Sequence, residues 1–174
     1  MSALSSEYKT LGHMQNLVYL SLGSNVGDRA SCLREAIREL EHLGRVIAVS
    51  SFYETEPVEF TEQAWFLNCA VALETELPPE VLMSDLLGIE KKMGRERKLD
   101  KGPRSIDLDI LLYGEAIIDT LHLTIPHPAM AYRRFVLEPL AEIAPEAWHP
   151  ILKKKIRALL EDLPEGQRVQ KVEP

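Results

Sequence analysis

Residues 106–113 have the sequence Ile-Asp-Leu-Asp-Ile-Leu-Leu-Tyr. Successive side chains of a β-strand point to opposite faces of the sheet. The alternation of Ile106, Leu108 and Ile110 with two aspartates therefore predicts a strand with one buried face, followed by a wholly apolar end. This strand is the fourth that the sequence predicts, and it is the last element of the core whose order is described next.

The elements before this strand follow from hydrophobic periodicity and turn residues. Strands are expected over residues 17–22, 46–53 and 66–73, and helices after the N-cap Asp28 and after Pro79. The first strand is expected to end at a turn formed by Gly23, Ser24 and Asn25. The order is β-α-β-β-α-β, which predicts an α+β fold with a ferredoxin-like core, an antiparallel sheet and helices packed on it.

A C-terminal extension is expected after this core. A short strand pair around residues 115–124 predicts a β-hairpin, the prolines within residues 125–128 predict a corner, and two helical stretches follow. The lysines at 153–155 are interpreted as a solvated helix start.

Length and composition predict one ordinary domain. The chain has 174 residues, of which 45% are hydrophobic and 27% charged. We expect a single domain over residues 17–174, preceded by a flexible extension or cloning remnant over residues 1–16. The net charge of −7 argues against nucleic-acid binding. The sequence has no apolar stretch long enough to span a membrane, so we do not expect a membrane protein. We expect a cytoplasmic monomer in which Cys32 and Cys69 are reduced, Cys69 as inert packing.

One segment carries most of the positive charge. Residues 91–104 hold seven basic and two acidic side chains, whereas the rest of the chain has a net charge of −12. Such a concentration predicts either a site for a small polyanion such as a nucleotide or a solvated helix end and loop.

The aspartates at 107 and 109 form the most specific local pattern. Their carboxylates share one face of the strand and repel each other unless a cation lies between them. Hard oxygen ligands suit Mg²⁺, and pairs of such ions occur where phosphates react. The alternative is an acidic, solvent-facing strand edge. The basic segment directly before this strand favours a phosphate and metal site.

Residues 100–111, Asp-Lys-Gly-Pro-Arg-Ser-Ile-Asp-Leu-Asp-Ile-Leu, carry a family resemblance. They resemble the signature of the 6-hydroxymethyl-7,8-dihydropterin pyrophosphokinase (HPPK) family. Blocks at residues 22–28, 50–55, 66–68, 94–97 and 125–128 agree in order and spacing.

The resemblance implies transfer of pyrophosphate from ATP to the hydroxymethyl group of 6-hydroxymethyl-7,8-dihydropterin, a step of folate biosynthesis that releases AMP. It implies two Mg²⁺ ions held by Asp107 and Asp109, with Arg95 and Arg104 also catalytic. The implied ATP site comprises Glu90, Arg97, Arg104, Ile110, Thr124, His127 and Arg133. The implied pterin site comprises Thr55, Val58, Phe66, Asn68 and Phe135. The two phenylalanine rings would stack on the pterin, and the segment 95–103, with Arg95, would close as a lid over bound substrates.

The chain also departs from the family pattern. Lys101 stands where some members have tryptophan, and Glu56 replaces a common proline. Taken alone, Phe66 and Phe135 are equally consistent with ordinary core packing, and His127 with a rigid corner.

Three functions follow from these patterns. The first is the pterin pyrophosphokinase. The second is another two-metal enzyme on a ferredoxin-like sheet, such as a nucleotidyl transferase or cyclase. The third is a small-molecule-binding module without catalysis, which would need neither paired carboxylates nor an arginine cluster. We expect the first.

Overall fold

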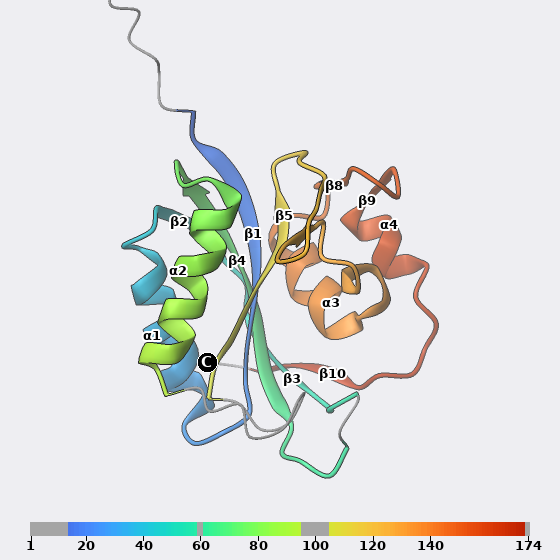
Figure 1. The fold of residues 1–174 in the computed structure, drawn as a ribbon. Helices are drawn as coiled ribbons and strands as arrows, with labels where there is room; N and C mark the ends of the chain where they lie inside the picture. The colour runs from blue at the N-terminus through green and yellow to red at the C-terminus, as the bar shows by residue number, and fades with distance from the viewer. Residues whose placement is uncertain (1–13, 59–60, 95–104, 173–174) are drawn as a thin grey trace, which may run out of the picture.

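The computed structural model describes residues 14–58, 61–94 and 105–172 (Figure 1). The β-strands are β1 (Asn16–Ser24), β2 (Arg45–Val49), β3 (Phe52–Thr55), β4 (Phe66–Thr75), β5 (Asp107–Tyr113), β6 (Ile118–Asp119), β7 (Thr124–Ile125), β8 (Trp148–His149), β9 (Lys154–Lys155) and β10 (Val169–Val172). The helices are α1 (Arg29–Leu40), α2 (Pro79–Lys92), the 3₁₀ turn η1 (Met130–Tyr132), α3 (Arg134–Ile143) and α4 (Ile156–Glu161).

The main sheet is antiparallel and has the strand order β10-β3-β4-β1-β5, with β2 also paired to β4. The helices α1 and α2 cover one face of the sheet, and α3 and α4 lie on the other (Figure 1). The connection through α1 joins β1 to β2 and passes over β4, and the connection through α2 joins β4 to β5 and passes over β1. This arrangement confirms the ferredoxin-like core that the order of elements predicted.

Two hydrophobic cores form because strand side chains alternate between the faces. On β4, Cys69, Val71 and Leu73 belong to the core beneath α1 and α2, whereas Ala70 belongs to the core beneath α3 and α4. Burial raises the pKa of the Cys69 thiol to about 12, so this cysteine is an unreactive packing residue at neutral pH, as predicted.

The strand predicted over residues 46–53 is divided in two. β2 and β3 both pair with β4, but Ser50 and Ser51 between them belong to neither strand. The Ser50 hydroxyl accepts a hydrogen bond from the Ala70 N–H, and the Ser50 N–H donates to the Ala70 carbonyl, each at 2.9 Å. Ser50 therefore satisfies the N–H and the carbonyl of Ala70 on β4 between the two strands. Such a contact leaves no periodic signal in the sequence.

The first strand is longer than predicted, because Gly23 and Ser24 are its last residues and not part of a turn. The turn begins at Asn25, whose amide donates to Gln63 Oε1 and the Ala64 carbonyl. Asn25 thus fastens the loop before β4. After the turn, Asp28 caps α1 by accepting a hydrogen bond from the Ser31 N–H at 3.0 Å, as expected for the N-cap.

The C-terminal extension contains the predicted hairpin, β6–β7, and the helices α3 and α4. The interpretation of the lysines as a helix start was wrong. Lys154 and Lys155 form β9, paired with β8, and the helix begins one residue later. Lys153 takes the left-handed φ of 56° that closes this tight hairpin.

The final strand, β10, pairs with β3 and is not signalled by the sequence pattern. The ladder extends beyond the strand ends through Glu56, whose N–H donates to the Arg168 carbonyl at 3.2 Å. The Glu56 carboxylate in turn accepts a hydrogen bond from the Arg168 N–H at 2.9 Å. A proline has neither the N–H nor the carboxylate that make these two hydrogen bonds. The glutamate, where the family commonly has proline, therefore allows the pairing with Arg168.

Every helix among the described residues is too short or too polar to cross a bilayer.

Candidate substrate and metal site

Three antiparallel strands bring distant residues into one row across the sheet. Gly23 of β1 pairs with Asn68 of β4 on one side and with Asp107 of β5 on the other. Neighbouring strands lie about 4.8 Å apart, so the main chains of Asn68 and Asp107 lie about 10 Å apart across Gly23. A predicted pterin residue and a predicted metal ligand are therefore separated by roughly the length of a small bicyclic molecule.

The two aspartates occupy the sheet face that carries α3. Leu108 and Ile110 belong to the opposite core, so Asp107 and Asp109, which alternate with them, face the α3 side. Both carboxylates are half-buried. The sequence prediction that they share one face is confirmed.

A buried hydrogen bond holds the strand segment between these aspartates. The Glu90 side chain, only 3% exposed, accepts a hydrogen bond from the Leu108 N–H at 2.8 Å. β5 is an edge strand, so this carboxylate takes the place of a neighbouring strand's acceptor. Glu90 was predicted as a nucleotide contact; the structure gives it the additional role of fixing the strand that carries the aspartates.

The predicted pterin residues Thr55, Phe66 and Asn68 lie together on β3 and β4. Thr55 pairs directly with Phe66. The Asn68 side-chain amide donates to Thr55 Oγ1 at 2.5 Å, and both residues are at least 97% buried. This bond fixes the orientation of the Asn68 amide and leaves its carbonyl oxygen beside Gly23.

Gly23 is a site residue that sequence reasoning missed, because it was interpreted as part of a turn. A β-carbon there would lie 2.6 Å from Asn68 Oδ1 and 3.7 Å from a carbon of the Phe66 ring. A glycine within a strand often marks a close approach of this kind. A prediction that continued the first strand through Gly23 could have identified it.

We expect the Gly23→Ala variant to bind 6-hydroxymethylpterin about tenfold more weakly, which corresponds to the loss of one well-placed hydrogen bond. The new methyl group must displace the Asn68 amide from its present position. Isothermal calorimetry measures this affinity. Gly88→Ala is the matched control, because Gly88 is exposed on α2 and a β-carbon there has no neighbour within 4 Å. Unchanged affinity in Gly23→Ala would place Asn68 outside the pterin site.

Phe135 approaches the same sheet face from α3. It is half-buried against the second core, and the Arg133 guanidinium lies over its ring with Cζ 5.6 Å from the ring centroid. Phe66 is also half-buried. Neither ring is fully packed in a core, so each retains surface on which a planar ligand can stack.

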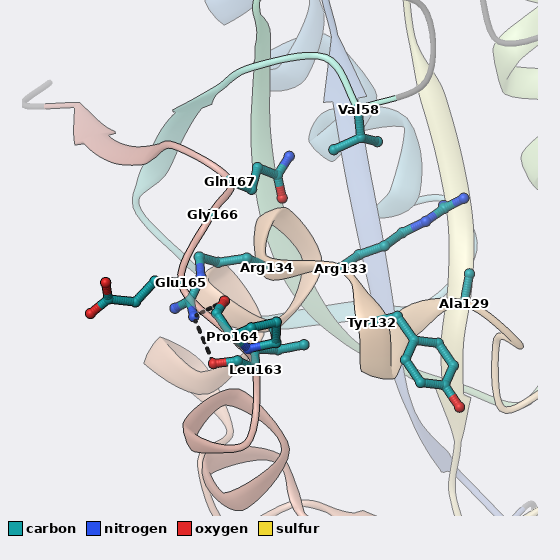
Figure 2. A pocket seen from close by; sticks show the side chains of 10 residues that line it. All are labelled: Val58, Ala129, Tyr132, Arg133, Arg134, Leu163, Pro164, Glu165, Gly166 and Gln167. Atoms are coloured by element: carbon teal, nitrogen blue, oxygen red, sulfur yellow. Dashed lines mark hydrogen bonds between the residues drawn. The ribbon is translucent and has the colours of Figure 1, made fainter.

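Val58 lies in a loop beyond this group, with 49% of its surface exposed. It lines a cavity of 380 Å³ together with Tyr132, Arg133 and the C-terminal residues 163–167 (Figure 2). The cavity thus joins a predicted pterin residue to a predicted nucleotide residue.

Three further residues of the predicted ATP set are described. Thr124 is exposed at the start of β7, and His127 is half-buried in the corner after it. The Ile110 side chain is 4% exposed and packs in the first core. A nucleotide contact from Ile110 would therefore use its main chain. Arg95, Arg97, Arg104 and the predicted lid over residues 95–103 lie outside the described residues.

His127 is electrostatically linked to two other predicted site residues. Burial lowers its pKa, the nearby Arg133 lowers it further, and Asp107 opposes this by raising it. The ring Nδ1 accepts a hydrogen bond from the Ala129 N–H at 3.1 Å. The neutral ring must therefore carry its proton on Nε2, which is available to donate to a ligand oxygen.

We expect His127 to titrate with a pKa below the ordinary value of 6.5 and to be neutral at pH 7 in the free protein. The folded state therefore becomes less stable as the pH falls below 6.5, because His127 binds a proton more readily in the unfolded chain than in the folded one. Proton NMR of the imidazole C2–H resonance, assigned by its disappearance in His127→Gln, measures the midpoint. A midpoint above 6.5 would show that Asp107 outweighs burial and Arg133.

The donor set fits a hard cation that is shared with phosphate. Within residues 14–58, 61–94 and 105–172 no group of three or more His, Cys, Asp or Glu side chains could enclose a metal by itself. Asp107 and Asp109 offer two carboxylates on one open face. Such a set suits Mg²⁺, which usually keeps water and phosphate oxygens among its ligands.

Residues 19–145 match the family described as 7,8-dihydro-6-hydroxymethylpterin-pyrophosphokinase (HPPK). Two similar proteins are named 2-amino-4-hydroxy-6-hydroxymethyldihydropteridine pyrophosphokinase. The Bacillus subtilis protein is 48% identical over 132 residues, which are 75% of this chain and 79% of that protein. The Aquifex aeolicus protein is 42% identical over 140 residues, which are 80% of this chain and 88% of that protein.

Longer proteins contain a similar region. The Pneumocystis carinii folic acid synthesis protein fol1 is 42% identical over 147 residues, but the chain spans only 20% of its length. A crystal structure of Plasmodium falciparum HPPK-DHPS with pteroate superposes with a TM-score of 0.70 at 18% identity. That match covers 90% of this chain and 44% of the other, and it supports the fold.

Proposed function

This chain belongs to the 7,8-dihydro-6-hydroxymethylpterin-pyrophosphokinase family, and from this we propose how its residues carry out the family's reaction. The enzyme transfers pyrophosphate from ATP to the hydroxymethyl group of 6-hydroxymethyl-7,8-dihydropterin, in folate biosynthesis. The hydroxymethyl oxygen loses its proton to solvent and forms a bond to the β-phosphorus of ATP. The bond from that phosphorus to the oxygen bridging to the α-phosphate breaks, and AMP leaves.

The row of Asn68, Gly23 and Asp107 is the observation that carries the assignment of roles. It sets the proposed pterin-binding amide and the proposed metal-binding carboxylate on one sheet face, with a glycine between them whose missing side chain makes room for the Asn68 carbonyl oxygen. A substrate held at Asn68 would therefore present its hydroxymethyl group toward the aspartates. Positioning of this kind supplies a large part of the catalysis of phosphoryl transfer.

At the pterin end, Asn68 has one amide N–H and its carbonyl oxygen left to bind the amide-like edge of the pterin, because the other N–H is used by Thr55. Phe66 and Phe135 would stack on the two faces of the ring, and Val58 would close its outer side. The burial of Asn68 and Thr55 excludes water from this edge. A ligand without matching polar atoms would leave these groups unpaired and would be rejected.

At the phosphate end, Asp107 and Asp109 would hold two Mg²⁺ ions. Bound Mg²⁺ supplies positive charge that neutralises the phosphate oxygens as they react. His127 would donate from Nε2 to a phosphate oxygen, and Arg133 would add a cationic contact. Arg95, Arg97 and Arg104 would complete this charge, with Arg95 and Arg104 in catalytic roles. Glu90, Ile110 and Thr124 would contact the nucleotide.

Product analysis distinguishes this reaction from other phosphate chemistry. Protein, Mg²⁺, ATP and the pterin are mixed, and the nucleotide products are separated by chromatography. AMP formed only when the pterin is present supports pyrophosphate transfer. ADP would indicate transfer of a single phosphoryl group, and free pyrophosphate would indicate nucleotidyl transfer.

We also propose that the enzyme is cytoplasmic. We expect it to act as a monomer, because one chain supplies all the residues of the proposed site. Size-exclusion chromatography with light scattering measures this mass directly against the 19.7 kDa of the chain.

A further inference from the structure

The C-terminal segment over residues 163–168 reaches the proposed pterin site from outside the part of the chain that matches the family, which ends at residue 145. It runs along the start of α3 and leads into β10, which lies beside β3 (Figure 1). The Arg134 guanidinium fastens it by donating to the Leu163 and Pro164 carbonyls, at 3.4 and 3.3 Å (Figure 2).

One side chain of this segment bridges two walls of the site. The Gln167 amide donates to the Glu56 carbonyl at 3.1 Å, and its Oε1 accepts a hydrogen bond from the Phe135 N–H at 3.2 Å. Glu56 directly follows Thr55 and lies two residues before Val58. The glutamine therefore ties the main chain of Phe135, a proposed stacking residue, to the segment from the end of β3 to Val58, which carries two other predicted pterin residues.

The bond to Phe135 satisfies a group that the helix cannot satisfy itself. The first N–H groups of a helix have no partner within the helix, and an N-cap side chain usually supplies one. The N-cap of α3 is Arg133, which makes no such bond. Gln167, 32 residues away, provides the missing acceptor and so fixes the first turn of α3 and the direction from which Phe135 leaves it.

The other side of the bridge is held just as firmly. The adjacent residue, Arg168, makes two hydrogen bonds with Glu56. Its N–H donates to the Glu56 carboxylate, and its carbonyl accepts from the Glu56 N–H. Gln167 is therefore anchored to the loop through its own side chain and through its neighbour. A movement of this segment would shift the start of α3 relative to that loop.

We propose that Gln167 is a positioning residue that sets the separation of Phe135 from the Thr55–Val58 wall and thereby determines affinity for the pterin. The inference rests on the proposed function for the identity of the ligand. The side chain of Gln167 makes its hydrogen bonds to the Phe135 N–H and the Glu56 carbonyl, both at the proposed pterin end, so it should influence binding of the pterin without altering the chemical step.

The experiment compares Gln167→Met, which keeps the side-chain length but removes both hydrogen bonds, with Gln167→Glu, which keeps the acceptor for Phe135. We expect Gln167→Met to bind 6-hydroxymethylpterin about tenfold more weakly and to show the same rise in KM for the pterin. Its kcat and its KM for ATP should change less than about twofold. Gln167→Glu should recover part of the affinity, because a carboxylate still accepts from the Phe135 N–H.

Gln170→Met is the matched control, because Gln170 is exposed on β10, which directly follows this segment. Calorimetry measures pterin binding without turnover. A wild-type protein that binds the pterin but forms no AMP would contradict the proposed reaction. The pterin affinities of the variants would still decide this inference. Unchanged pterin affinity in Gln167→Met would overturn the inference. Equal losses of pterin affinity, ATP affinity and thermal stability would also overturn it, because they indicate a purely structural role.

Discussion

Turnover is expected to fall by about 10²-fold or more when either Asp107 or Asp109 is replaced by Asn. The substitution keeps the size and shape of the side chain but removes the charge that would hold Mg²⁺ against the triphosphate. The expected result is a lower kcat, together with a higher Mg²⁺ concentration for half-maximal rate. AMP release under saturating ATP and pterin, measured across a Mg²⁺ titration, gives both quantities.

Both variants should remain folded, because both side chains are half-buried and Asn is nearly isosteric with Asp. Circular dichroism during thermal unfolding checks this point. Asp162→Asn is a suitable control, since Asp162 forms a surface ion pair with Lys154 at the end of α4. Near-normal turnover in both site variants would remove the two aspartates from the metal site.

The second large effect concerns the phenylalanines. We expect Phe66→Ala and Phe135→Ala each to weaken pterin binding by about 1–3 kcal/mol, the range measured for aromatic stacking on nucleic-acid bases. ATP binding should change little. The free energy of unfolding should fall by less than the roughly 3–5 kcal/mol that removal of a buried core phenylalanine costs, because both rings are only half-buried.

Phe52→Ala is a matched control for this pair. Phe52 is half-buried on β3, packs against the core beneath α1 and α2, and has the Arg34 guanidinium over its ring at 5.8 Å, as Arg133 lies over Phe135. Its removal should lower stability and leave pterin affinity unchanged. If the site variants lost stability without losing pterin affinity, the rings would be ordinary packing residues.

Local patterns in the sequence were sufficient for the core of the fold. Helices α1 and α2 and strands β1, β4 and β5 each contain their own periodicity and end signals, so they could be predicted nearly at their observed positions. The spacing of Asp107 and Asp109 likewise places both carboxylates on one face, because that geometry depends only on the alternation within a strand.

Only the tertiary structure determined how these pieces make a site. The register that places Gly23 between Asn68 and Asp107 depends on the pairing of three strands that are distant along the chain. The role of Glu90 depends on β5 being an edge strand, and the bridge made by Gln167 joins residues 32 and 111 positions away. Such contacts leave no periodic signal, because their partners meet only after long loops close around a shared core. The sequence therefore predicted which side chains carry the chemistry, and the packing of the folded chain determined which other residues hold them in place.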